Sequence, residues 1–111
     1  MVKFGLGYDV HSLEKGSSLT IGGLEIPSKH SSQGHSDGDV LTHAIIDALL
    51  GAANLGDIGK HFPENKEWKR VRSLDLLSIS LEKVNSLGFK LNNIDSVVIL
   101  QTPYISEFVP D

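Results

Sequence analysis

Apolar and glycine positions at the start of the chain predict strands. Residues 3–10 (KFGLGYDV) form a short apolar run that favours an extended strand. The following SLTIGGLEIP predicts two further strands that turn at Gly22 and Gly23, because a two-residue hairpin needs positive φ at its central residues. Pro27 should end the second of these strands. Residues 28–38 are polar and contain glycine, so we expect an exposed loop there.

Two later segments carry a helical pattern. Between residues 37 and 54, apolar side chains recur every three or four positions, which predicts a helix. A second helix is predicted from residue 73 to residue 87, with Gly88 after its end and one apolar face, made by Leu74, Leu77, Leu81 and Val84. Residues 94–100 (IDSVVIL) predict a buried strand, and the last seven residues predict the start of another helix.

The order of these elements predicts an α/β fold of the α+β type, with helices packed on one face of a mixed sheet. The length of 111 residues suits one domain, residues 1–111. A net charge of −4 gives no basic footprint for nucleic acid, and no apolar run is long enough to cross a bilayer. Cysteine is absent, so a metal would need histidine and carboxylate ligands.

Asp9, His11 and His43 are the candidate metal ligands. Residues two apart in a strand point to the same face, so Asp9 and His11 aim the same way. Two imidazoles and one carboxylate leave a coordination position open, as in catalytic zinc sites, and the same set also describes non-haem iron. The alternative is that His43 is a core histidine paired with Asp39 or Asp47, four residues away on its helix. Spacing alone favours this second interpretation.

Three other clusters each allow a structural and a functional interpretation. Ser36 and Asp39 resemble a capping box at the helix start, with Asp37 as another candidate N-cap, whereas His35 and Ser36 on a loop suit a phosphate at that helix end. Residues 56–59 are typical of a turn, or present a carboxylate and backbone amides to substrate hydroxyls. Residues 100–105 (LQTPYI) predict either a strand end with a proline turn or a backbone-lined pocket for a flat base.

Taken together, GYDVH, TIGGLEIP, GHSDGDVLTHAIIDALLGAANLGDIGKHFP and the later QTP closely resemble the 2-C-methyl-D-erythritol 2,4-cyclodiphosphate synthase family. The resemblance covers essentially the whole chain, and the long central block is its most specific part. It implies conversion of 4-diphosphocytidyl-2-C-methyl-D-erythritol 2-phosphate to 2-C-methyl-D-erythritol 2,4-cyclodiphosphate, with release of CMP. That reaction belongs to the non-mevalonate route to isoprenoid precursors. The enzyme would be a metal-dependent phosphorus–oxygen lyase.

The resemblance also implies the roles of single residues and the partners. Zn²⁺ would be held by Asp9, His11 and His43, and a second ion, Mg²⁺ or Mn²⁺, mainly by the substrate diphosphate. The catalytic loop residues would be His35 and Ser36. The substrate-binding residues would be Asp57, Gly59, Glu64, Gln101, Thr102, Pro103, Tyr104 and Ile105. The family is homotrimeric with active sites between subunits, and its members need neither nucleic acid nor membrane. The implied location is the bacterial cytoplasm, or a plastid-type organelle in a eukaryote.

The chain departs from the family pattern in two places. Residues 64–73 are more basic than the family's segment, and the family's C-terminal portion does not follow residue 111. The alternatives are therefore a truncated, non-catalytic subunit that keeps metal and nucleotide binding, or another zinc-dependent phosphate-processing enzyme. An iron(II) oxygenase on the same ligand set is a further alternative.

Overall fold

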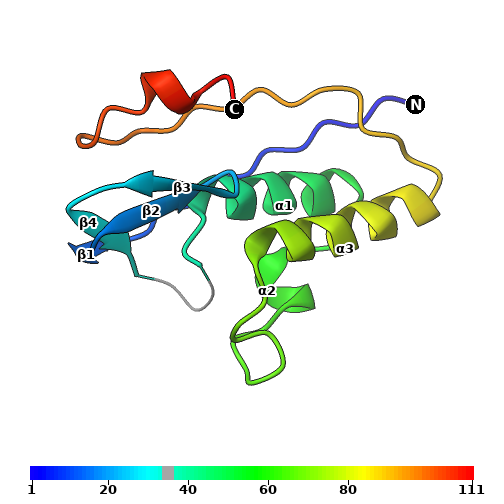
Figure 1. Ribbon diagram of the computed structural model, residues 1–111. Helices are drawn as coiled ribbons and strands as arrows, with labels where there is room; N and C mark the ends of the chain where they lie inside the picture. The colour runs from blue at the N-terminus through cyan, green and yellow to red at the C-terminus, as the bar shows by residue number, and fades with distance from the viewer. Residues whose placement is uncertain (34–36) are drawn as a thin grey trace.

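A computed structural model of the protein describes residues 1–33 and 37–111 (Figure 1). Two helices, α1 (Val40–Ala52) and α3 (Ser73–Ser86), lie side by side, and the strands lie at one end of this pair. A short helix, α2 (Ile58–His61), connects them, and a 3₁₀ helix, η1 (Ser106–Phe108), lies near the C-terminus. The protein is therefore a small α+β domain, in agreement with the predicted class.

The predicted hairpin is confirmed. Strands β2 (Ser18–Ile21) and β3 (Leu24–Pro27) pair antiparallel around Gly22 and Gly23, whose φ angles are +59° and +82°. Glycine tolerates this region of backbone space without a steric penalty. The side chains of Leu19 and Ile26 face each other across the pair and are buried, so the hairpin presents one apolar face to the core.

The loop predicted at residues 28–38 is wrong in part. It contains strand β4 (His30–Ser32), which pairs antiparallel with β1 (Leu13–Lys15). The prediction failed here because β1 and β4 are stabilised by hydrogen bonds between their backbones, which leave no apolar pattern in the sequence. The described residues therefore contain two two-stranded antiparallel sheets, and the expected mixed sheet is not among them.

The strands predicted at residues 3–10 and 94–100 are also wrong. Both segments are extended, but the described residues supply no strand that pairs with either. The first segment instead lies directly on α1, where a Cβ at Gly5 would collide with the carbonyl of Ala48. The second lies over the hairpin, and Val98 and Leu100 pack against its apolar face. Figure 1 shows both segments, in blue and orange, along the upper side of the helices.

Both helix predictions are confirmed, with changes at their ends and faces. Helix α1 begins at Val40 with Asp39 as its N-cap, so the predicted N-caps Ser36 and Asp37, and the capping box that placed Asp39 inside the helix, are wrong. Helix α3 follows the predicted range closely, and Gly88 after it has a φ of +88°. Its buried side is shifted from the predicted apolar face, since Leu74 is exposed and the buried residues are Ser73, Leu76, Ser80 and Val84.

The core between the helices fixes the position of α2. One cluster joins α1 and α3 to Phe62, directly after α2, and contains Ile46, Leu50, Phe62 and Leu76. The ring of Phe62 meets that of Trp68 edge to face, with centroids 5.1 Å apart. Among the described residues, no helix combines the length and the apolar character needed to cross a membrane.

Candidate metal centre

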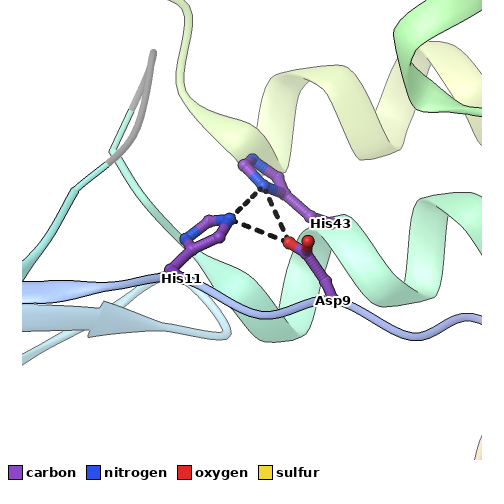
Figure 2. A group of neighbouring side chains, drawn as sticks. All are labelled: Asp9, His11 and His43. Atoms are coloured by element: carbon purple, nitrogen blue, oxygen red, sulfur yellow. Dashed lines mark hydrogen bonds and ion pairs between the residues drawn. The ribbon is translucent and has the colours of Figure 1, made fainter.

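The side chains of Asp9, His11 and His43 converge on one point (Figure 2). Oδ2 of Asp9 lies 2.9 Å from Nε2 of His11 and 3.4 Å from Nδ1 of His43. The two ring nitrogens are 3.3 Å apart. Asp9 and His11 come from the extended N-terminal segment and His43 from the first turn of α1, as Figure 2 shows. The structure thus brings together three residues that the sequence singled out.

Hydrogen bonds at the far side of each ring fix where its proton lies. Nδ1 of His11 is 2.9 Å from the carbonyl oxygen of Gly38, which can only accept, so Nδ1 carries the proton. Nε2 of the neutral His11 ring then points a lone pair at the cluster. Nε2 of His43 is 2.8 Å from the hydroxyl of Ser73, and Nδ1 faces the cluster. Both rings are therefore oriented as metal ligands are.

The three converging atoms are better explained as ligands of a metal than as partners in hydrogen bonds with one another. Oδ2 of Asp9 is buried and, within the described residues, has no hydrogen-bond donor. A buried carboxylate oxygen without a donor or a cation is costly. Zinc with bonds of about 2.0–2.1 Å in a tetrahedron places its ligand atoms about 3.3 Å apart, close to the distances in this cluster. The cluster can hold a divalent cation and leave one position open.

Ser73 and Asp37 extend the cluster and were not predicted for this role. The hydroxyl of Ser73 donates to Oδ1 of Asp37 at 2.5 Å, and the backbone amide of Ser73 donates to Oδ2 at 3.0 Å. Burial alone would raise the pKa of the Asp37 carboxyl. The hydrogen bonds from the hydroxyl and amide of Ser73 and from the amide of Asp39 outweigh it and lower this pKa below its ordinary value of 3.8. No local pattern could reveal a contact between residues 36 positions apart.

Asp39 holds the start of α1 against the hairpin. Its carboxylate accepts hydrogen bonds from the amides of Gly22, Gly23 and Thr42 and from the Thr42 hydroxyl, at 2.7–3.0 Å. The residue is completely buried. Asp39 is therefore occupied and does not pair with the ring of His43 through any interaction that the structure contains. Asp47 is likewise engaged elsewhere, accepting from the amide of Ile58 at 2.8 Å.

A cavity of about 480 Å³ opens beside the metal cluster. The cluster forms one wall, and α2 with the segment after it forms the other, through Ile58, Gly59, Phe62, Pro63 and Glu64. The predicted substrate residues Gly59 and Glu64 thus lie at the same cavity as the metal ligands. Asp57 does not line it. Its side chain caps α2 by accepting from the amide of Lys60 at 2.9 Å, which supports the structural interpretation for this residue.

The predicted base pocket lies elsewhere on this chain. Thr102 and Pro103 line a second cavity with residues 27–30, and Ile105 packs against the hairpin core. Gln101 and Tyr104 are exposed. Within the described residues, the segment 101–105 contributes nothing to the cavity beside the metal cluster. The predicted catalytic residues His35 and Ser36 lie outside the described part of the chain.

Comparisons with known proteins give one consistent result. The YgbB family model matches residues 2–111. A 2-C-methyl-D-erythritol 2,4-cyclodiphosphate synthase from Treponema denticola is 50% identical over 108 residues, which are 96% of this chain and 67% of the relative. A synthase of the same name from Gloeobacter violaceus is 51% identical over 110 residues, 98% of this chain and 68% of the relative. The chain spans about two thirds of the length of these relatives.

A solved structure shares the fold. It is a 2C-methyl-D-erythritol-2,4-cyclodiphosphate synthase in its CDP-bound form, with a TM-score of 0.92 and 39% sequence identity. The match covers 97% of this chain and 73% of that one. This structural similarity means that the hairpin, helices and extended segments of this chain are arranged as in the fold of that solved structure.

Proposed function

The chain belongs to the YgbB family, whose matched relatives are 2-C-methyl-D-erythritol 2,4-cyclodiphosphate synthases, and from this membership we propose how its residues serve that reaction. The activity is a lyase reaction of isoprenoid biosynthesis: a 2-phosphate attacks the β-phosphorus of a cytidine diphosphate ester, and CMP leaves. The convergence of Asp9, His11 and His43 on one point beside a cavity is the observation that supports the proposal most strongly.

The three ligand atoms would hold zinc, with Oδ2 of Asp9, Nε2 of His11 and Nδ1 of His43 as donors. When bound, the ion supplies a Lewis acid with an open position, which suits a phosphate oxygen. The protein's own contribution is positioning, because bringing two anionic groups together is the main barrier to such a cyclisation. A second ion, Mg²⁺ or Mn²⁺, would bind mainly through the diphosphate of the substrate.

The wall of the cavity opposite the metal cluster would orient the rest of the substrate. Gly59 carries no side chain there, so its backbone is accessible to a sugar hydroxyl. Glu64 faces the same cavity and would contact the substrate or the second ion. Asp57, which does not line this cavity, would serve the substrate indirectly by capping α2 and so holding Gly59 in place. We assign His35 and Ser36 to the phosphate, as the family resemblance implies.

Gln101 to Ile105 would bind the cytosine of a substrate held by a neighbouring subunit. The absence of this segment from the metal cavity, within the described residues, supports a site shared between chains. An outward row of apolar side chains supports the homotrimer as well, since Phe4, Leu6, Tyr8 and Val10 are all at least 68% exposed. Large exposed apolar patches usually mark an interface. The proposed compartment is the bacterial cytoplasm.

Product analysis tests the proposed reaction. Purified protein is incubated with the diphosphocytidyl methylerythritol phosphate, zinc and magnesium, and CMP is followed by chromatography while ³¹P NMR identifies the phosphorus product. We expect CMP and the cyclodiphosphate in equal amounts, with loss of both after chelation. Release of inorganic phosphate instead would indicate a zinc hydrolase. Cytidine nucleotide binding without turnover would indicate a non-catalytic subunit, and either result contradicts the proposal.

A further inference from the structure

The hydrogen bonds behind His43 form a chain with only one consistent direction. Asp37 is a carboxylate at neutral pH and can only accept, so the single hydroxyl proton of Ser73 points to it. The hydroxyl oxygen of Ser73 must then accept at its contact with Nε2 of His43. His43 therefore carries its proton on Nε2 and leaves Nδ1 free for a metal.

We propose that Asp37 and Ser73 are positioning residues for the metal ligand His43, and that they set which of its nitrogens binds the ion. The inference rests on the proposed metal site and adds a role for two residues outside it. The hydroxyl of Ser73 transmits the negative charge of Asp37 to the imidazole, which makes Nδ1 a stronger donor. Hydrogen-bonded carboxylates commonly tune metal-bound histidines in this way.

Burial and rigidity strengthen this role. Ser73 is completely buried at the first turn of α3, so bulk water cannot replace its hydroxyl. Asp37 is held by three donors: the hydroxyl and amide of Ser73 and the amide of Asp39. The ring of His43 is thus fixed between α1 and α3 by Ser73 and Asp37, whose own positions are set by burial and hydrogen bonds. Preorganised ligands bind a metal more tightly than ligands that must first be ordered.

The zinc affinity of four variants tests this chain of hydrogen bonds from Asp37 through Ser73 to His43, which we call the relay. Ser73→Ala removes the hydroxyl, and Asp37→Asn lets a neutral amide replace the acceptor. Ser73→Thr keeps the hydroxyl, and Ser80→Ala removes a buried serine of the same helix whose hydroxyl donates within that helix, to the carbonyl of Leu76. Affinity is measured by competition with a chromophoric chelator at pH 7.5. Thermal unfolding of the zinc-free proteins is recorded in parallel, to separate a loss of affinity from a loss of folding.

We expect zinc binding to weaken about 10- to 100-fold in Ser73→Ala and Asp37→Asn. Ser73→Thr should stay within about threefold of wild type, and Ser80→Ala should lose thermal stability without losing affinity. If the wild-type protein binds zinc and Ser73→Ala and Asp37→Asn bind it equally well, the relay is wrong but the metal site stands. A wild-type protein that binds no zinc would overturn the proposed metal site as well.

A second measurement needs no variant to fold. Long-range ¹H–¹⁵N NMR of the zinc-loaded wild-type protein reports which nitrogen of each histidine is protonated. The relay predicts a proton on Nε2 of His43, protected from exchange, and zinc on Nδ1. Zinc on Nε2, with the proton on Nδ1, would contradict the proposal even if every variant failed to fold.

Discussion

Asp39 shows how one side chain can fix the geometry around the site. Its carboxylate joins the turn of the β2–β3 hairpin to the first turn of α1, which carries His43. A capping interaction normally satisfies one or two amides of its own helix. Here the same carboxylate also satisfies the two amides of the hairpin turn, so the position of His43 depends on a side chain that is not part of the metal cluster.

Replacing Asp39 by alanine should therefore destabilise the protein by about 3 kcal/mol, because a buried cap is lost and the Thr42 amide is left unsatisfied. Asp75→Ala, an exposed substitution on α3, should cost less than about 0.5 kcal/mol. Urea unfolding of the two variants beside the wild type measures both values. Equal stability of the two variants would show that the hydrogen bonds of the Asp39 carboxylate contribute nothing to the stability of the fold.

The lowered pKa of Asp37 predicts a pH dependence of stability. A carboxyl whose folded-state pKa lies below its unfolded value stabilises the fold above the unfolded pKa, near 3.8. That contribution is lost as the pH falls through the folded pKa. The stability difference between wild type and Asp37→Asn should thus be constant from pH 7 to pH 5 and shrink as the pH falls below about 4. Denaturant unfolding across this range checks it, and a difference that grows toward acid would contradict the assignment.

The candidate metal ligands could be named from the sequence, with the family resemblance deciding against a core histidine, but the residues that support them could not. Asp9 and His11 are two residues apart in an extended segment, and the helical pattern around His43 placed that residue on a rigid element. Ser73 carries no such signal, because its contact with Asp37 depends on how α3 packs beside α1. The N-cap at Asp39 was misplaced by two residues, since Asp37 is drawn away by that same contact.

Helices were predicted more successfully than strands, for a physical reason. The periodicity of α1 and α3 is local, and each helix satisfies its own backbone. Strand formation needs a partner, and residues 3–10 and 94–100 have none among the described residues, despite their strand-like composition. The β2–β3 hairpin was predictable because its two strands are adjacent and Gly22 with Gly23 defines the turn.

Helix α2 is too short to be stable by itself and depends on its contacts. Nζ of Lys83 on α3 donates to Nδ1 of His61 at 2.8 Å, and Nε2 of His61 donates to the carbonyl of Leu55 at 2.7 Å. The same ammonium lies 5.6 Å from the ring centre of Phe62. Lys83 thus connects the cavity wall to α3.

Lys83→Met keeps the aliphatic stem and removes the charged donor. Since a hydrogen bond from a charged group contributes about 1.5–3 kcal/mol, the amide of Phe62, which bonds to Ile58, should exchange with solvent at least about tenfold faster. Glu82→Gln, at the exposed neighbouring position, is the control and should leave this exchange unchanged. Protection that survives Lys83→Met would mean that packing of Phe62 alone holds α2.

Two extended segments leave much of one side of the molecule apolar and uncovered. The outward side chains include Leu6 at 92% and Ile99 at 93% exposure. An isolated chain with such a surface would tend to associate. Assembly into the proposed trimer would cover part of this surface and bring the base-binding segment 101–105 to a neighbour's metal cavity.

Leu6→Glu should therefore disrupt assembly without unfolding the chain, because this side chain makes little contact within its own subunit. Light scattering should give three times the chain mass for the wild type and a smaller mass for the variant. Leu87→Glu places the same charge at an exposed leucine at the end of α3 and should leave the mass unchanged. A wild-type mass equal to that of one chain would contradict the trimer.

Anomalous X-ray diffraction at the zinc edge, on crystals of protein purified without chelator, tests the metal centre most directly. We predict one anomalous peak per chain, about 2.0–2.2 Å from Oδ2 of Asp9, Nε2 of His11 and Nδ1 of His43. Crystals of His43→Ala should lack the peak. A zinc-supplemented crystal in which these three atoms bind no ion would contradict the metal centre, and with it the proposed function.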